Sequence, residues 1–114
     1  MPLPELIRQD VEAKLTSYCG NRVPAHLRDE IRVGFELRGN AVTLFEERPH
    51  WKDKSKWVHR VVAQFRFDPS KRQWTLYCAD RNSRWHRYPD PPPSKLVDSL
   101  LKEVDLDSTG VFWG

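Results

Sequence analysis

The fold of this chain is decided by one stretch of sequence, Val61-Val62-Ala63-Gln64-Phe65-Arg66-Phe67-Asp68-Pro69-Ser70-Lys71-Arg72-Gln73-Trp74-Thr75-Leu76-Tyr77-Cys78. Apolar and polar side chains alternate on both sides of residues 68–71, and alternation with a period of two predicts β-strands. Asp, Pro and Ser at 68–70 favour a turn between them. We therefore predict two antiparallel strands, at about 57–67 and 73–79, with inward side chains Val61, Ala63, Phe65, Phe67, Trp74, Leu76 and Cys78.

Tight turns decide which residues of neighbouring strands face each other, because a hairpin's register follows from its loop length. The turn at 68–71 sets the register of the two central strands. A second tight turn near Arg81-Asn82 leads to a fifth strand at 84–88, with Trp85 inward. The predicted cross-strand pairs are Phe65 with Trp74, Ala63 with Leu76, Cys78 with Trp85, Tyr77 with His86, Thr75 with Tyr88 and Leu76 with Arg87.

A further hairpin is predicted upstream, at 31–38 and 41–48. Apolar and polar residues alternate through the first segment, and Gly39-Asn40 is typical of a two-residue hairpin turn. The turn pairs opposite charges on the outward side and lets an aromatic ring cover the backbone of a glycine. The predicted pairs are Leu37 with Val42 and Phe35 with Leu44 inside, and Arg32 with Glu47 and Gly34 with Phe45 outside.

Two helices flank the strands. A helix is predicted at 4–19, because apolar residues recur every three or four positions, and Gly20 is placed to end it. A second helix is predicted at 95–105, capped by Ser94. The tail at 107–114 contains Val-Phe-Trp and is predicted to dock on the body. The apolar faces consist of Ile7, Val11, Leu15 and Tyr18 in the first helix and Leu96, Val97, Leu100, Leu101 and Val104 in the second.

These elements predict an α+β fold in a single domain at 1–114. The fold is a five-stranded antiparallel meander sheet with an N-terminal and a C-terminal helix packed on one face. Each helix has one apolar stripe and the sheet has one apolar face, so both helices are expected on that face. The opposite face of the sheet is left open.

Composition argues against several classes of protein. No apolar run approaches the ~18 residues of a membrane span, and the start lacks a signal-peptide pattern. Cys19 and Cys78 support neither a disulfide framework nor a zinc site, and His50, His59 and His86 have no Cys companion. We therefore expect a cytoplasmic protein with no cofactor, no metal and no membrane contact.

Charge is concentrated in one part of the chain. Residues 48–88 hold 11 Lys or Arg against 3 Asp or Glu, a local net charge of +8, whereas the whole chain carries +3. Because an electrostatic field acts over roughly a Debye length, this local excess bears more on binding partners than the overall charge does.

The outward side chains of the last three strands predict a contact surface for single-stranded nucleic acid. Arginines beside aromatic rings on an exposed sheet can hold phosphates and stack unpaired bases. Tyr and Thr are also good strand formers and Arg keeps an exposed sheet soluble, so a purely structural interpretation stays open. The candidate contact residues are Arg66, Tyr77, Arg84, His86 and Tyr88, beside Gln64, Gln73 and Thr75.

An alternative hypothesis is a protein-interaction or regulatory domain. Trp51 and Trp57 flank Lys52, Lys54 and Lys56 in a basic loop, and exposed tryptophans often anchor a protein partner. The same rings can instead pack over an edge of the sheet. An exposed edge strand also permits pairing across a two-fold axis, so both a monomer and a homodimer stay open.

A third hypothesis is a small hydrolase or nuclease that uses Glu46, Glu47, Asp80 and His86. Glu46 falls on the inward face, where a carboxylate needs a cation, and Arg48 and Arg87 are the candidates. A structural ion pair at the rim of the sheet is the competing explanation. We prefer a binding module to an enzyme, because the sequence has no phosphate-binding loop and no nucleophile elbow.

Three motifs resemble one known family. They are Glu47-Arg48-Pro49-x-Trp51, then Trp74-Thr75-Leu76-Tyr77 leading through Asp80-Arg81-Asn82 to Arg84-Trp85-His86-x-Tyr88, and last Gly110-x-Phe112-Trp113-Gly114. From about Ile31 onward the chain is similar to a bacterial family of small stand-alone proteins known as domain of unknown function number 3024. The resemblance implies a bacterial, cytosolic setting and transfers no activity or cofactor. The matching positions are Glu47, Arg48, Trp51, Trp74, Tyr77, Asp80, Arg81, Asn82, Trp85, Tyr88 and Trp113.

Overall fold

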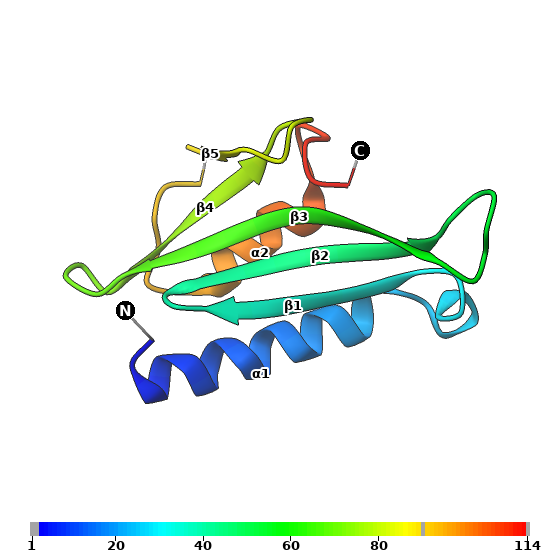
Figure 1. Ribbon diagram of the computed structural model, residues 1–114. Helices are drawn as coiled ribbons and strands as arrows, with labels where there is room; N and C mark the ends of the chain where they lie inside the picture. The colour runs from blue at the N-terminus through cyan, green and yellow to red at the C-terminus, as the bar shows by residue number, and fades with distance from the viewer. Residues whose placement is uncertain (1–2, 90, 114) are drawn as a thin grey trace.

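The computed structural model (Figure 1) describes residues 3–89 and 91–113, so both ends of the predicted 1–114 domain, Gly114 of its tail included, lie outside the described residues. One antiparallel sheet has the strand order β1-β2-β3-β4-β5, and a helix lies at each end of the chain. The predicted α+β class is confirmed. The elements are α1 (Glu5–Arg22), a short 3-10 helix η1 (Ala25–Leu27), β1 (Arg32–Arg38), β2 (Ala41–Pro49), β3 (Trp57–Asp68), β4 (Gln73–Ala79), β5 (Trp85–Arg87) and α2 (Val97–Leu106).

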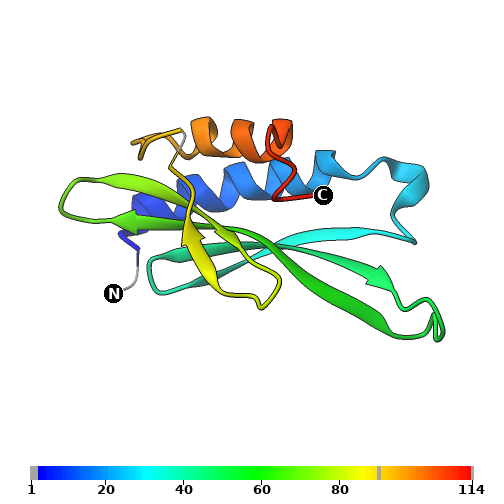
Figure 2. The same cartoon turned by 90° about the horizontal axis from the view of Figure 1, so that it is seen from above.

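Both helices lie on the same side of the sheet (Figure 2). The core forms between them and the inward side chains of the strands, which drives folding by removing apolar surface from water. Its fully buried members include Leu15 of α1, Phe65 and Leu76 of the central strands, and Leu100 and Val104 of α2. No described helix covers the other side of the sheet, which we call the open face.

The β1–β2 hairpin has the predicted register. Arg32 pairs with Glu47 and Phe35 with Leu44. Gly34 lies beneath the ring of Phe45, and a Cβ added to this glycine would lie only 2.8 Å from the ring's Cζ atom. Glycine is required here by the close approach of the ring.

A β-bulge interrupts the pairing of β2 with β3. Leu44 pairs with Ala63, but Phe45 pairs with Val61, so that Val62 is the extra residue of β3. Val62 is buried, whereas Val61 is half-buried on the open face. The predicted inward position of Val61 is therefore wrong. Beyond the bulge, Arg60 takes the position opposite Glu46.

The β3–β4 register differs from the prediction by two residues. Phe65 pairs with Leu76 and Ala63 with Cys78, because the four-residue loop is 69–72 and not 68–71, and Arg72 within it has a φ of 53°. The carboxylate of Asp68 accepts hydrogen bonds from the backbone N–H groups of Ser70 (2.9 Å) and Lys71 (3.4 Å). A shift of two residues preserves sidedness, so the predicted inward residues of β4 stay on the core side.

The β4–β5 register differs by one residue, which reverses every side chain of β5. The turn holds three residues, with Ser83 in the left-handed region at a φ of 60°. The observed pairs are Tyr77 with Arg87, Cys78 with His86 and Ala79 with Trp85. The predicted partners of Trp85, His86, Arg87 and Tyr88 are wrong. Trp85 and Arg87 lie on the open face, and His86 and Tyr88 lie on the helix side.

Both helices end or begin differently from the prediction. α1 continues through Gly20 to Arg22, because nothing obstructs a glycine inside a helix, so the predicted stop is wrong. α2 begins at Val97, and Ser94 instead forms a β-bridge with Trp74 while its Oγ accepts a hydrogen bond from Leu96 N (3.1 Å). Leu96, predicted as buried, is 58% exposed.

The tail after α2 packs back on the body. The carboxylate of Asp107 accepts hydrogen bonds from the N–H groups of Phe112 (3.0 Å) and Trp113 (2.9 Å). The indole of Trp113 donates to the carbonyl of Val104 (3.0 Å), and the ring of Phe112 is fully buried. These contacts hold the tail against the end of α2, and Phe112 also contacts Tyr88 and accepts a hydrogen bond from Arg60 of β3.

Candidate functional site

The open face carries a row of polar and aromatic side chains across three strands. The guanidinium of Arg66 stacks 3.9 Å from the ring centre of Tyr77. Arg66 Nε donates to Gln64 Oε1 (2.6 Å), and Gln64 Nε2 donates to Thr43 Oγ1 (3.0 Å). The interactions hold Arg66 in one orientation, with its second planar surface turned away from the tyrosine.

Two residues that the sequence did not predict for this face complete the row. Arg87 is paired with Tyr77, and Trp85 is paired with Ala79 two residues along the same strands. A hollow of about 200 Å³ lies beside them and is open to solvent. Its lining consists of Asp68, Lys71, Gln73, Thr75, Tyr77, Arg87 and Pro93. The hollow therefore offers two cations, one carboxylate, one aromatic ring and several hydrogen-bonding groups within a small area.

The rest of the open face is less basic than the charge pattern predicts. Counted over the whole open face, the paired positions of the five strands hold four arginines and three carboxylates. Trp57 is half-buried under the guanidinium of Arg32, which lies 3.7 Å from its ring centre. Phe45 lies against His59, with 4.6 Å between ring centroids. The lysines and arginines of residues 48–88 are found largely in the loops at the ends of the strands.

The five predicted nucleic-acid contacts do not all lie together. Arg66 and Tyr77 lie on the open face, and Arg84 is exposed just before β5. Tyr88 is buried under α2 and the tail, where its hydroxyl donates to Glu103 Oε2 (3.0 Å). His86 is exposed on the helix side. The predicted positions of Tyr88 and His86 on the open face are wrong because of the one-residue slip in β5.

His86 is engaged with Asp80, which closes the β4–β5 turn. His86 Nε2 lies 2.7 Å from Asp80 Oδ2, and the other carboxylate oxygen accepts from the N–H groups of Asn82 (2.8 Å) and Arg84 (3.0 Å). The hydrogen bond from His86, followed by those from the backbone, lowers the pKa of Asp80 below its ordinary value. Asp80 thus has a clear structural role.

Glu46 is the one buried carboxylate of the described residues, at 8% exposure. Its oxygens accept hydrogen bonds from Arg48 Nε (3.1 Å) and Arg60 Nη2 (3.4 Å). Arg60 also donates through Nη1 to the carbonyl of Phe112 (3.0 Å), which ties the tail to β3. The predicted partner Arg48 is confirmed, whereas Arg87 points to the open face. Glu46 is explained by a structural ion pair.

The four groups of the hydrolase hypothesis are divided between the two sides of the sheet. Glu46 faces the helices, and its neighbour Glu47 faces the open side, where its carboxylate lies 3.3 Å from His59 Nδ1. Asp80 and His86 are paired with each other. Within residues 3–89 and 91–113, no three His, Cys, Asp or Glu side chains are grouped to hold a metal ion.

The two cysteines are not activated thiols. Burial raises the pKa of the Cys19 thiol to about 11 and also raises the pKa of the Cys78 thiol. A nucleophilic cysteine needs the opposite shift, because the thiolate is the reactive form.

The two tryptophans of the basic loop have different surroundings. Trp51 is 78% exposed at the loop, with Lys52 Nζ 5.0 Å from its ring centre. Trp57 begins β3 and is stacked with Arg32 on the open face. Trp57 is therefore engaged by Arg32, whereas Trp51 is available for contact.

The comparison with known families gives a single result. A family described as a domain of unknown function, DUF3024, matches residues 3–114, and the chain belongs to that family. The match reaches beyond the similarity seen from Ile31 onward and includes α1. No curated protein and no solved structure matches the chain. Among the described residues, no helix has both the length and the apolar character needed to cross a membrane.

Proposed function

We propose that this family member binds single-stranded nucleic acid on its open face, in the bacterial cytoplasm that the resemblance implies. The observation that carries the proposal is the row formed by Arg66, Tyr77 and Arg87 on three adjacent strands. A half-buried aromatic ring beside two guanidinium groups provides both a stacking surface and phosphate-binding cations.

The stacking surface is a composite of two side chains. Arg66 already covers one face of Tyr77 at 3.9 Å. A base can stack on the outer side of this guanidinium plane, as unpaired bases do on arginine as well as on aromatic rings. Trp85 is half-buried and lies two residues from Arg87 along β5, where it supplies a second ring for the next base. Sequence preference is expected to be weak, because stacking does not read base edges.

The phosphate contacts come from the hollow beside the row. Lys71 and Arg87 both line it, and neither side chain is hydrogen-bonded or ion-paired to another described residue. Each cation that meets a phosphate releases counterions, so affinity falls as salt rises, with a slope of about −0.7 per contact for single strands.

The proposal is tested by fluorescence anisotropy with a labelled mixed-sequence single-stranded DNA and RNA at low salt. Tyr77→Ala should weaken binding by about tenfold, since stacking on one ring is worth roughly 1–3 kcal/mol. Arg87→Ala should reduce the salt slope by about 0.7. Lys102→Ala, which removes one charge from the exposed side of α2, is the matched control. Absence of binding by the unmodified protein removes the proposal.

A second candidate function is protein recognition anchored by Trp51. Its 78% exposure and the lysines around it are the specific observation in favour. Capture of one stoichiometric protein partner that survives nuclease treatment and is lost in Trp51→Ala, but not in Trp57→Ala, would support this function over nucleic-acid binding.

A further inference from the structure

β3 is longer than the strand that pairs with it on one side. It pairs with β2 from Trp57 to Arg66, but its pairing with β4 begins only at Ala63. Figure 1 shows β3 continuing beyond the point at which β4 turns away from it. One side of residues 57–62 is therefore an edge of the sheet, which we call the free edge.

The free edge has unsatisfied backbone groups. Apart from the ladders of β3 with β2 and with β4, no hydrogen bond between described residues reaches the backbone of residues 57–62. Six extended residues span roughly 20 Å, which is as long as an ordinary strand. An edge of this kind is a template for another strand.

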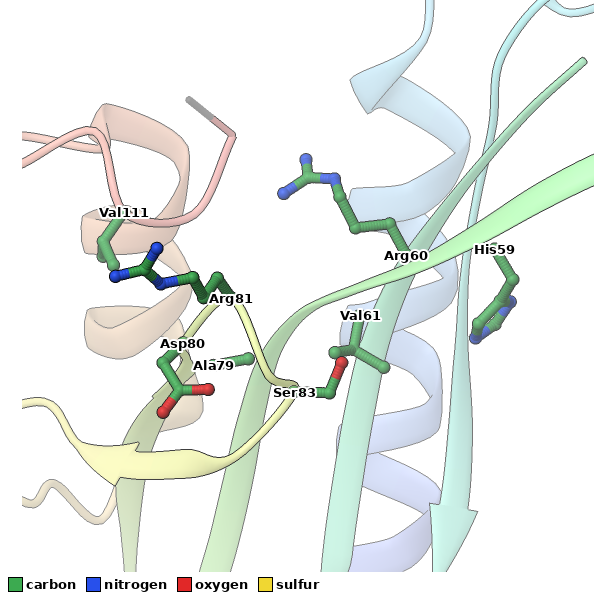
Figure 3. Close-up of a pocket in the computed structure, with 8 residues that line it drawn as sticks. All are labelled: His59, Arg60, Val61, Ala79, Asp80, Arg81, Ser83 and Val111. Carbon is green, nitrogen blue, oxygen red and sulfur yellow. The ribbon is translucent and has the colours of Figure 1, made fainter. Parts of the chain in front are cut away.

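A cavity of about 400 Å³ lies where β4 would run if it continued along β3. It is lined from β3 by His59, Arg60 and Val61, and from the end of β4 and its turn by Ala79, Asp80, Arg81 and Ser83, with Val111 of the tail. Figure 3 shows Arg81 reaching from the turn toward Val111, with Arg60 across from it on β3. The space left by β4 is thus bordered by two guanidinium groups.

The positive charge that Arg81 brings to this cavity has no ion-pair partner among the described residues. Both oxygens of Asp80 are occupied by the turn and by His86. Arg60 shares its charge with Glu46. Arg81 makes no ion pair or hydrogen bond to any residue that the structure describes. Arg81 therefore supplies unused cationic donors beside the unpaired backbone groups of the free edge.

A second hollow lies along the same stretch of β3 and has a different character. It holds about 370 Å³ and is lined by Val58 and Trp113 together with Glu46, Arg48 and Arg60. Val58 is 48% exposed. Side chains of an added strand alternate between the two faces, so some would enter the arginine-bordered cavity and the others would contact this partly apolar hollow.

We infer that the free edge binds an extended acidic segment of another protein by β-strand addition. The partner's backbone pairs with residues 57–62, and its carboxylates meet Arg81 and Arg60. Nucleic acid does not fit, because its sugar-phosphate backbone has no row of alternating donors and acceptors. A second copy does not fit either, because antiparallel pairing of two free edges would bring Arg60 and Arg81 of both copies together.

The inference is tested with a fluorescein-labelled peptide of three Glu-Val repeats and the ¹⁵N-labelled full chain. The peptide is expected to bind, to shift the amide signals of residues 57–62 and to slow their hydrogen exchange. Peptides methylated on every second backbone nitrogen, in both phases, form the control, and at least one should lose binding because methylation removes a pairing donor. A Lys-Val repeat should not bind.

Two protein variants separate this edge from general electrostatics. Arg81→Glu should weaken peptide binding by about tenfold or more, since a charge-assisted hydrogen bond is lost and a repulsion is gained. Arg38→Glu makes the same change of charge on β1, at the opposite edge of the sheet, and should leave binding close to that of the unmodified chain. Tyr77→Ala should not alter peptide binding, which distinguishes this edge from the open face.

Several results would overturn the inference. They are full binding by both methylated peptides, signal shifts on the open face in place of residues 57–62, and equal weakening by Arg38→Glu. Protection of the edge amides in the peptide-free chain, together with a dimer in sedimentation, would assign the edge to self-association. Protection of the same amides by an oligonucleotide would assign it to nucleic acid.

Discussion

The two hairpins at the ends of the sheet follow the same alternation of apolar and polar residues, yet only one has the register that the alternation predicts. β1 and β2 share seven paired positions and a two-residue turn whose Gly39 has a φ of 60°. β4 and β5 share three pairs and a three-residue turn in which Ser83 takes the left-handed conformation. A long hairpin specifies its register through turn and side-chain pattern together, whereas a short one depends on the turn alone.

The slip in the short hairpin exchanges two side chains for two others. Tyr88 and His86 leave the open face, and Trp85 and Arg87 take their places. The open face therefore keeps an aromatic ring and gains a guanidinium, and the character required for stacking survives while half of the residues change. The kinds of side chain on a surface can thus be predicted more securely than the individual residues that supply them.

The largest expected effect on stability comes from replacing, one at a time, the two tyrosines that the one-residue slip places on opposite sides of the sheet. Tyr88→Ala should lower the free energy of unfolding by roughly 3 kcal/mol, because the ring is buried against Phe112 and its hydroxyl donates to Glu103. Tyr77→Ala should cost about 1 kcal/mol or less, since its ring is only half-buried. Urea denaturation measures both, and a reversed order would restore the register predicted from the sequence.

The strands were predictable wherever several alternate side chains of a strand are buried, because the pattern then does not depend on any one residue. Alternation located every strand, and the core positions of β4 survived a two-residue shift. The bulge was not predictable, because Val61 and Val62 are equally apolar and nothing in the sequence says which one turns outward. Of the two partners of Glu46, Arg48 was predicted and Arg60 was not, because the bulge is what brings Arg60 opposite Glu46.

The free edge also could not be predicted from local pattern. It depends on β3 extending past the end of β4, and that overlap follows from the loop lengths at both ends of β4. Loop lengths are encoded by the left-handed residues Arg72 and Ser83, which are not the residue types that usually signal this conformation.

In the long hairpin, the next largest effect should come from the glycine under Phe45. Gly34→Ala should lower the free energy of unfolding by about 1 kcal/mol, because the new methyl group would lie 2.8 Å from the ring. Gly20→Ala is the matched control, since it lies within α1 with nothing within 4 Å. It should raise stability by about 0.5–1 kcal/mol. Thermal and urea midpoints should move in opposite directions for the two variants.

In the short hairpin, a pH-dependent effect is expected from Asp80. Because the hydrogen bond from His86 and those from the backbone lower the pKa of Asp80, its contribution to stability is present above the ordinary Asp pKa, near 3.9, and is lost as the pH falls through the lowered value. Asp80→Asn should therefore lower the unfolding midpoint at pH 6 but make little difference near pH 2.

Asp68→Asn offers a parallel case in the β3–β4 loop, where hydrogen bonds from Ser70 lower the pKa of Asp68 in the same way. Thermal midpoints measured across this pH range for both variants test the idea. A difference from the unmodified protein that is independent of pH would show that the carboxylate charge is not what closes the turn.

The smallest expected effect tests the turn itself. Ser83→Gly should raise the free energy of unfolding by a few tenths of a kcal/mol, because glycine adopts the φ of 60° found at this position without steric cost. The gain is limited by the greater flexibility of glycine in the unfolded chain. Replacement by valine should instead destabilise, since a β-branched residue resists the left-handed conformation. If glycine and valine behaved alike in urea denaturation, the three-residue turn, and with it the placement of Trp85 and Arg87 on the open face, would be wrong.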